Sequence, residues 1–185
     1  MAIHAHQQHL YTAEEFAAMQ RDGWRAELIE GEVVAMPAAF TDHGETAANI
    51  SYLVGQFVRP KRIGKIYGAE TGFLVARNPD TVRAPDFAYI HTRRLPPPGI
   101  PFWGRVMPDI VAEVVSSGDR IKEIDRKVKM WLAAGVPLIW VAWPQVRMLQ
   151  VYEPPAPVQE LDDTATLTGG AVLPGFSVPV AEIFG

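Results

Sequence analysis

The chain has 185 residues, 48% of them hydrophobic and 21% charged, which predicts one well-packed domain over residues 1–185 with a flexible N-terminus at residues 1–10. It contains no cysteine, which excludes disulfide bonds and thiolate metal sites, and no apolar run reaches the roughly 18–20 residues that span a bilayer. The N-terminus also lacks the pattern of a secretory signal, so we expect a cytoplasmic protein without a membrane segment. The formal net charge of -4 argues against a protein that coats nucleic acid by bulk charge, but it leaves room for a nuclease with a local basic patch.

The first half of the chain predicts short elements divided by turn residues. Thr12 and Glu15 have the spacing of a capping box and predict a short helix over about residues 13–20. Hydrophobic periodicity predicts the other elements of this half, which are a hairpin at 26–36, a longer helix at about 42–58, and strands at 65–76 and 83–91. Asn78-Pro79-Asp80 is a turn signal and separates the last two strands.

The second half begins with a proline-rich loop at residues 95–104 and continues with the most informative segment, PDIVAEVVSS. This run of β-branched residues predicts a buried strand. The elements that follow are a helix at about 120–134 closed by Gly135, strands at 137–142 and 147–152, and a tail of turns and short edge strands. Strand, helix and strand with short connections predict a parallel crossover. The fold class is therefore α/β (α+β), with a mixed central sheet flanked by helices.

One carboxylate interrupts the most apolar strand. Alternate residues of a strand share a face, so Glu113 lies on the same side as Val111 and Val115. Burying a carboxylate among valines is costly unless it is paired, hydrogen-bonded or bound to a metal. Asp86 interrupts another apolar run, just after a proline. Two such carboxylates meeting at the ends of adjacent strands would form a hard, oxygen-rich site suited to Mg²⁺ or Mn²⁺.

A structural role explains the same two residues. Asp86 and Glu113 can pair with arginine or lysine, or accept hydrogen bonds from backbone amides. A single carboxylate in a strand is common, and the adjacency of the two strands is itself an inference. The sequence pattern leaves both explanations open.

The order of segments resembles a known family. It runs from ELIEGEVVAMP through a helix with His43, APDFAYI, MPDIVAEVVSS and a lysine-bearing helix ending in AAGVPLIWV, to LPGFSVPVAEIF. This order resembles the Uma-type (Uma-two) restriction endonucleases of the PD-(D/E)XK nuclease superfamily, over about residues 11–184. The resemblance implies a restriction-endonuclease-like fold.

By position, the PD of the superfamily corresponds to Pro85-Asp86 and its (D/E)XK to the segment from Glu113 to Val115. Valine therefore stands where the lysine is expected. The Uma-type family shows a variation in which this lysine comes from the following helix, and the corresponding residue here is Lys127. Spacing alone cannot select it, because Lys127 and Lys129 lie on opposite flanks of the apolar stripe of that helix, formed by Ile121, Ile124, Val128, Trp131 and Leu132.

Other positions match the family less specifically. The resemblance implies that Glu27 lies beside the site, where it would hold a second metal or orient a water, and that His43 contacts phosphate or a metal-bound water. A half-exposed strand residue and a capping or surface histidine are the plain alternatives. Trp143 departs from the family, which usually has aspartate before this proline. The basic run at residues 59–65 and the pair Arg93-Arg94 are candidates for phosphate contacts, or simply solvated.

The resemblance implies a Mg²⁺- or Mn²⁺-dependent endonuclease that hydrolyses DNA. Asp86, Glu113 and the Val114 carbonyl would hold the metal, and Lys127 would stabilise charge on the phosphate. A non-catalytic binding or assembly module that retains the fold is the main alternative, and a phosphohydrolase acting on small nucleotides or RNA is a weaker one. Nucleases that cut both strands commonly act as dimers, and Phe102 and Trp103 offer apolar surface for a homodimer.

Overall fold

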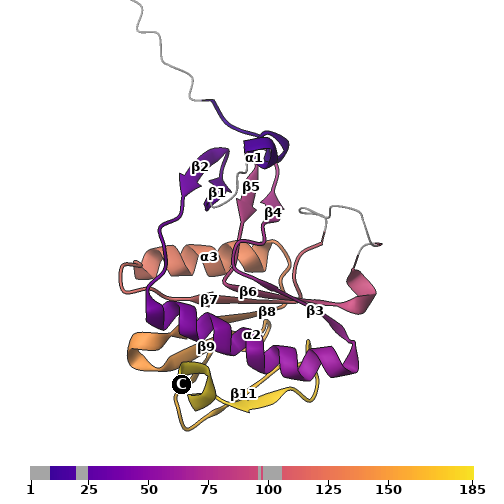
Figure 1. Ribbon diagram of the computed structural model, residues 1–185, viewed down its shortest axis with the longest axis vertical. Coiled ribbons are helices and arrows are strands. Elements are labelled where there is room, and N and C mark those ends of the chain that lie inside the picture. The colour runs from indigo at the N-terminus through magenta and orange to yellow at the C-terminus, as the bar shows by residue number, and fades with distance from the viewer. Residues whose placement is uncertain (1–8, 20–24, 96, 98–105) are drawn as a thin grey trace, which may run out of the picture.

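A six-stranded mixed sheet with a helix on each face forms the centre of the molecule (Figure 1). The computed structural model describes residues 9–19, 25–95, 97 and 106–185. The strand order is β10-β9-β8-β7-β6-β3. These strands are β3 (Gly64–Gly68), β6 (Phe87–His91), β7 (Ile110–Val114), β8 (Leu138–Trp143), β9 (Met148–Tyr152) and β10 (Gln159–Leu161). The helices are α2 (Thr41–Lys61) and α3 (Ile121–Ala133).

The alternation along β7 divides the core into two halves. Ile110, Ala112 and Val114 pack in the same cluster as the apolar residues of α2. Val111 and Val115 pack on the other side, in the cluster that contains the apolar face of α3. Glu113 therefore faces α3, as the period of two along the strand predicts.

The predicted parallel crossover is confirmed. Strands β7 and β8 pair in parallel with α3 between them, whereas the other pairs of this sheet are antiparallel. The helix ends where predicted, since Gly135 has a φ of +87° and follows its last turn. The prediction that Ile121 belongs to the apolar stripe is wrong. Ile121 is the first residue of α3 and is 74% exposed.

A second sheet stands at one end of the central one, beside α1 (Ala13–Met19) (Figure 1). Its strand order is β2-β1-β5-β4, with bounds β1 (Ala26–Ile29), β2 (Glu32–Ala35), β4 (Phe73–Ala76) and β5 (Thr81–Arg83). The expected hairpin is confirmed as β1 and β2, which pair antiparallel. The capping box is also present, since the Glu15 amide donates to Thr12 Oγ1 and the Thr12 amide donates to the Glu15 carboxylate.

The bounds of two predicted strands are wrong. The strand expected at residues 65–76 is divided into β3 and β4, which lie in different sheets. The strand expected at 83–91 is confirmed only as β6, and its first residue, Arg83, is instead the last residue of β5 in the second sheet. The first break is a turn in which Glu70 has a φ of +79°. The second break is at Ala84-Pro85-Asp86, where proline lacks the N–H that a continuous ladder requires. Asp86 thus lies at the junction between the two sheets.

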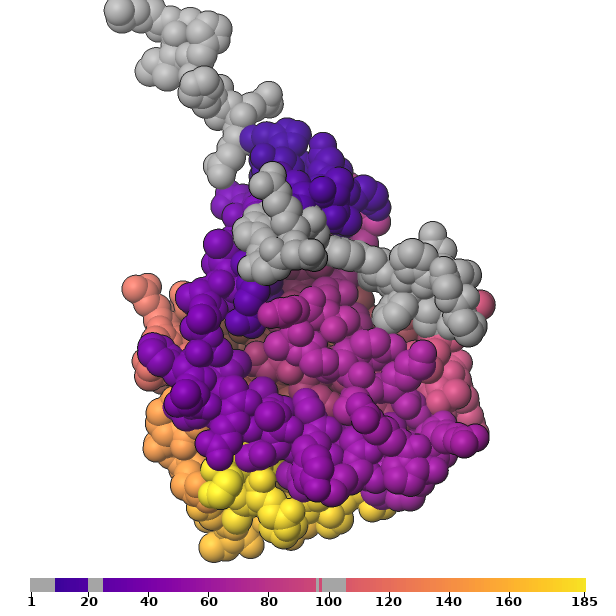
Figure 2. All heavy atoms as spheres, in the orientation of Figure 1, coloured from indigo at the N-terminus to yellow at the C-terminus, as the bar shows by residue number. Residues whose placement is uncertain are grey.

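The C-terminal segments pack on the α2 side of the central sheet. They are β11 (Thr166–Thr168), β12 (Ser177–Pro179) and α4 (Ala181–Phe184). Buried Leu167, Phe176 and Ile183 share the core cluster of α2. On the face shown in Figure 2, α2 crosses the molecule above these yellow segments. Helix α2 is longer than expected. It ends at Lys61 rather than at about residue 58, with Pro60 in its last turn.

Several expectations fall outside the described residues. These are the flexible N-terminus up to residue 8, the helix end at Gln20, most of the loop at 95–104, and the apolar surface of Phe102 and Trp103. Within the described ranges, none of the helices combines the length and apolar character needed to cross a lipid bilayer.

Candidate active site

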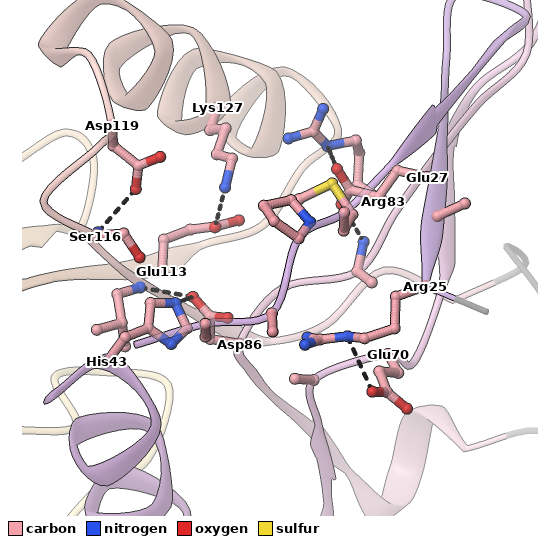
Figure 3. Close-up of a pocket in the computed structure, with 18 of the residues that line it drawn as sticks. Arg25, Glu27, His43, Glu70, Arg83, Asp86, Glu113, Ser116, Asp119 and Lys127 are labelled. Carbon is pink, nitrogen blue, oxygen red and sulfur yellow. Dashed lines mark hydrogen bonds and ion pairs between the residues drawn. The ribbon is translucent and has the colours of Figure 1, made fainter. Parts of the chain in front are cut away.

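A cleft of about 670 Å³ lies where the two sheets meet, and its wall carries most of the predicted site residues (Figure 3). The second sheet contributes Glu27 and Arg83 to this wall. The central sheet contributes Glu113, α3 contributes Lys127 and α2 contributes His43. Asp86 also lines the cleft, from the junction between the sheets. The fold therefore brings together five elements that are distant in sequence.

Glu113 is buried in β7 and has two partners on α3. Lys127 Nζ lies 2.9 Å from Glu113 Oε2, and Trp131 Nε1 donates to Glu113 Oε1 at 2.8 Å. The partners are four residues apart, so they project from the same side of the helix. Burial alone would lower the pKa of Lys127, but the charge and hydrogen bond of Glu113 outweigh it and raise that pKa. Lys127 is accordingly an ammonium group at neutral pH.

Asp86 lies directly before β6, where it meets the end of β7. Phe87 pairs with Ala112, so the antiparallel register places Asp86 next to Glu113 at the same end of the sheet. Asp86 Oδ2 accepts a hydrogen bond from the Val114 amide at 2.8 Å and lies 3.2 Å from His43 Nε2. The other oxygen, Oδ1, accepts no hydrogen bond from any of the described residues. One face of this carboxylate is thus available to a ligand.

His43 lies in the first turn of α2 and contacts the same Asp86 oxygen, Oδ2, that accepts from the Val114 amide of β7. The hydrogen bond to Asp86 outweighs burial of the ring, so the pKa of His43 is raised. The side chain of His43 is mostly buried and does not cap α2. Both plain alternatives for His43, a surface residue and a helix cap, are therefore wrong.

Glu27 lines the same cleft but is directed to its own partners. Its carboxylate accepts a hydrogen bond from the Ala84 amide at 2.8 Å and lies 3.3 Å from Arg83 Nε, as an ion pair without hydrogen-bond geometry. Burial raises the pKa of Glu27 in spite of these neighbours. The plain alternative of a half-exposed strand residue is wrong, since Glu27 is 4% exposed.

The remaining basic candidates lie elsewhere. Lys129 pairs with Asp125 on the exposed side of α3, and Arg94 pairs with Asp109. None of these residues, nor the described run at 59–65, contributes to the wall of the cleft. Trp143, at the position where the family usually has aspartate, donates from its indole to Gln150.

Sequence reasoning missed three residues of the cleft region. Trp131 was assigned only to the apolar stripe, and Arg25 and Arg83 received no role. The spacing of Trp131 from Lys127 was the available signal, because a residue four positions after a site lysine faces the same neighbour. For the arginines no local signal existed, since their proximity depends on how the two sheets meet.

Replacing Trp131 by phenylalanine tests how much Glu113 depends on the indole. The change leaves Glu113 Oε1 buried without its donor, so we expect the free energy of unfolding to fall by about 1–3 kcal/mol. Trp143→Phe is the matched control, because its indole bond is partly exposed and its loss should cost less than about 1 kcal/mol. Urea denaturation of the two variants measures the difference. Equal costs would show that the bond to Glu113 contributes nothing beyond packing.

Comparisons with known proteins bear on the fold and the family of this chain. The fold resembles the crystal structure of a putative nuclease belonging to DUF820 from Anabaena variabilis, with a TM-score of 0.80 and 19% sequence identity. The match covers 94% of this chain and 97% of that one. The fold class is therefore α+β with a mixed central sheet, as the sequence predicts. No functionally curated protein matches the sequence.

The family is shown by a second comparison. The family model Uma2, described as "Putative restriction endonuclease", matches residues 13–181. The chain belongs to the Uma2 family, and the resemblance noted from its ordered segments is confirmed.

Proposed function

We propose that this protein is a Mg²⁺- or Mn²⁺-dependent endonuclease that hydrolyses phosphodiester bonds of DNA. The observation that carries the proposal is the placement of Asp86 and Glu113 at adjoining ends of β6 and β7, in one cleft, with the Lys127 ammonium on Glu113. Membership of the Uma2 family supports it.

The cleft residues fit a divalent cation of this kind. Asp86 and Glu113 offer hard carboxylate oxygens, and the Val114 carbonyl is the third ligand that the family pattern implies. In the described part of the chain, no three histidine, aspartate or glutamate side chains form a complete metal site. Mg²⁺ characteristically binds through one or two carboxylates and completes its shell with water and substrate phosphate, so two carboxylates suffice.

Lys127, His43 and Trp131 would each support the reaction in a different way. A bound cation would polarise the phosphate and lower the pKa of the attacking water. Lys127 stabilises the negative charge that accumulates on the phosphate oxygens, and a raised pKa keeps it protonated. His43 and Trp131 orient Asp86 and Glu113 by hydrogen bonds. Hydrolysis forms one bond from the water oxygen to phosphorus and breaks one P–O ester bond; the attacking water loses a proton to solvent, and the leaving alkoxide takes one up to become the alcohol.

Binding of Mn²⁺ tests the metal site directly. We expect calorimetry to show one Mn²⁺ site in the wild type, and its loss in Asp86→Asn. The affinity should fall between about pH 8 and about pH 5, because carboxylate ligands must be deprotonated to bind metal. Asp125→Asn is the matched control, since Asp125 is an exposed carboxylate on α3 and should leave binding unchanged. An affinity that does not vary with pH, or that survives Asp86→Asn, would contradict the proposed site.

A non-catalytic module has one observation in its favour. Both carboxylates are already compensated, Glu113 by Lys127 and Trp131 and Asp86 by His43 and the Val114 amide. Such pairing would suffice to keep buried carboxylates in a purely structural site. Absence of metal binding in the calorimetry, together with an intact fold, would favour this second function.

A further inference from the structure

The cleft has an apolar rim in addition to its charged wall. The segment from Met36 to Phe40, which joins β2 to α2, lines the cleft beside His43. The side chain of Phe40 is 64% exposed and that of Met36 is 36% exposed. A largely exposed aromatic residue therefore lines the cleft three positions before His43, the residue that contacts Asp86.

Stability of the fold does not explain this ring. Phe40 is the N-cap residue of α2 and makes no side-chain cap. Serine, threonine, aspartate or asparagine is preferred at an N-cap because the side-chain oxygen accepts a hydrogen bond from an unpaired helical amide. Phe40 provides neither that bond nor much buried area. Its backbone is nevertheless held in place, since its carbonyl accepts the first hydrogen bond of the helix from Gly44.

The fixed charges of the cleft largely compensate one another. The lining residues include three cations, Arg25, Arg83 and Lys127, and five carboxylates, Glu27, Glu70, Asp86, Glu113 and Asp119. Each of the cations already pairs with one of these carboxylates. Without the proposed metal, the attraction of these side chains for phosphate, which usually dominates nucleic-acid affinity, is therefore weak. An apolar contact to a base supplies affinity that does not depend on charge.

We infer that Phe40, supported by Met36, stacks on an unpaired nucleobase next to the scissile phosphate, so that the cleft accepts single-stranded or locally opened DNA. This inference rests on the proposed function. In an intact duplex the faces of the bases are covered by their neighbours, and only an unpaired or extruded base offers its face to a side chain. The cleft volume of about 670 Å³ is in the range of sites for small ligands, which suits one or two nucleotides.

Binding of fluorescent oligonucleotides, measured in Ca²⁺ to prevent turnover, tests this inference. Phe40→Ala should weaken binding of a single-stranded oligothymidine by about 5- to 100-fold, as expected for loss of one stacked base. Binding of a blunt duplex should be weak and unchanged. Phe40→Trp should retain the affinity, whereas Phe40→Leu, which keeps the apolar character but not the ring, should resemble Phe40→Ala.

Tyr52→Ala is the matched control, because Tyr52 is also 64% exposed on α2 but is not a lining residue of the cleft. Unchanged single-strand binding in Phe40→Ala, or an equal loss for duplex, would overturn the inference. The inference would also be overturned if light scattering showed a dimer for the wild type and a monomer for Phe40→Ala, because Phe40 would then lie in a protein–protein contact. Plasmid nicking distinguishes failure of the stacking inference from failure of the proposed endonuclease function. If Phe40→Ala still nicks and its preference for single-stranded over duplex DNA is unchanged, only the stacking inference is refuted. If Asp86→Asn nicks as fast as the wild type, the proposed function is refuted.

Discussion

Replacing Glu113 by glutamine is expected to lower the rate of Mg²⁺-dependent plasmid nicking by about 10³-fold or more. The amide oxygen of glutamine can still accept the hydrogen bond from Trp131, whereas the ion pair with Lys127 is lost. The negative charge that would hold the cation is removed. The nicking rate under single-turnover conditions measures the effect, and circular dichroism checks the fold.

The control for this variant is Glu123→Gln. Glu123 is an exposed residue of the first turn of α3, so the same chemical change there should leave the rate within about twofold, as surface substitutions usually do. A Glu113→Gln variant that nicks at the wild-type rate would remove Glu113 from the metal site and leave it as the structural partner of Lys127.

Replacing Lys127 by alanine should lower turnover by about 10²–10³-fold while leaving Mn²⁺ binding in place, because the lysine stabilises the transition state and is not a ligand. Lys129→Ala removes a lysine from the same helix. The side chain of Lys129 is 73% exposed and pairs only with Asp125, so its loss should change the rate little. The nicking assay and Mn²⁺ calorimetry on both variants provide the comparison.

The outcomes for the two lysines are distinct. If Lys127→Ala nicks as fast as the wild type while Glu113→Gln is inactive, the lysine assignment is wrong and the metal site stands. If Lys127→Ala loses Mn²⁺ binding as well as turnover, the lysine acts by holding Glu113 in place. If even the wild type cuts no DNA, the non-catalytic module becomes the better description.

Local periodicity explains which parts of the fold were predictable. The alternation in β7 and the apolar stripe of α3 are properties of 5 and 13 consecutive residues, and the crossover follows from their order. The breaks in two predicted strands were not predictable in this way. Residues 65–76 and 83–91 each read as one strand, and only pairing with distant strands determines which sheet each part joins.

The site shows the same limit. Asp86 and Glu113 were conspicuous because carboxylates are costly in apolar strands, and the structure does place them in one cleft. Helical spacing put Lys127 and Lys129 on opposite flanks, and only the position of α3 on the sheet decides that Lys127 reaches Glu113. The sequence could not predict that Arg83 is the partner of Glu27, because the pairing of β1 with β5 brings these two residues together.

The Lys127–Glu113 ion pair has a consequence for how ligands communicate in the cleft. In the protein alone, the ammonium and the carboxylate satisfy each other. On the proposed function, a cation that takes over Glu113 weakens its hold on Lys127, which then becomes a better donor to phosphate. Phosphate that attracts Lys127 likewise frees Glu113 for the cation. Since coupling free energies between ligands are reciprocal, each ligand must raise the affinity for the other by the same factor. The cleft would therefore bind metal and DNA cooperatively, and its affinity for each ligand would be lower in the absence of the other.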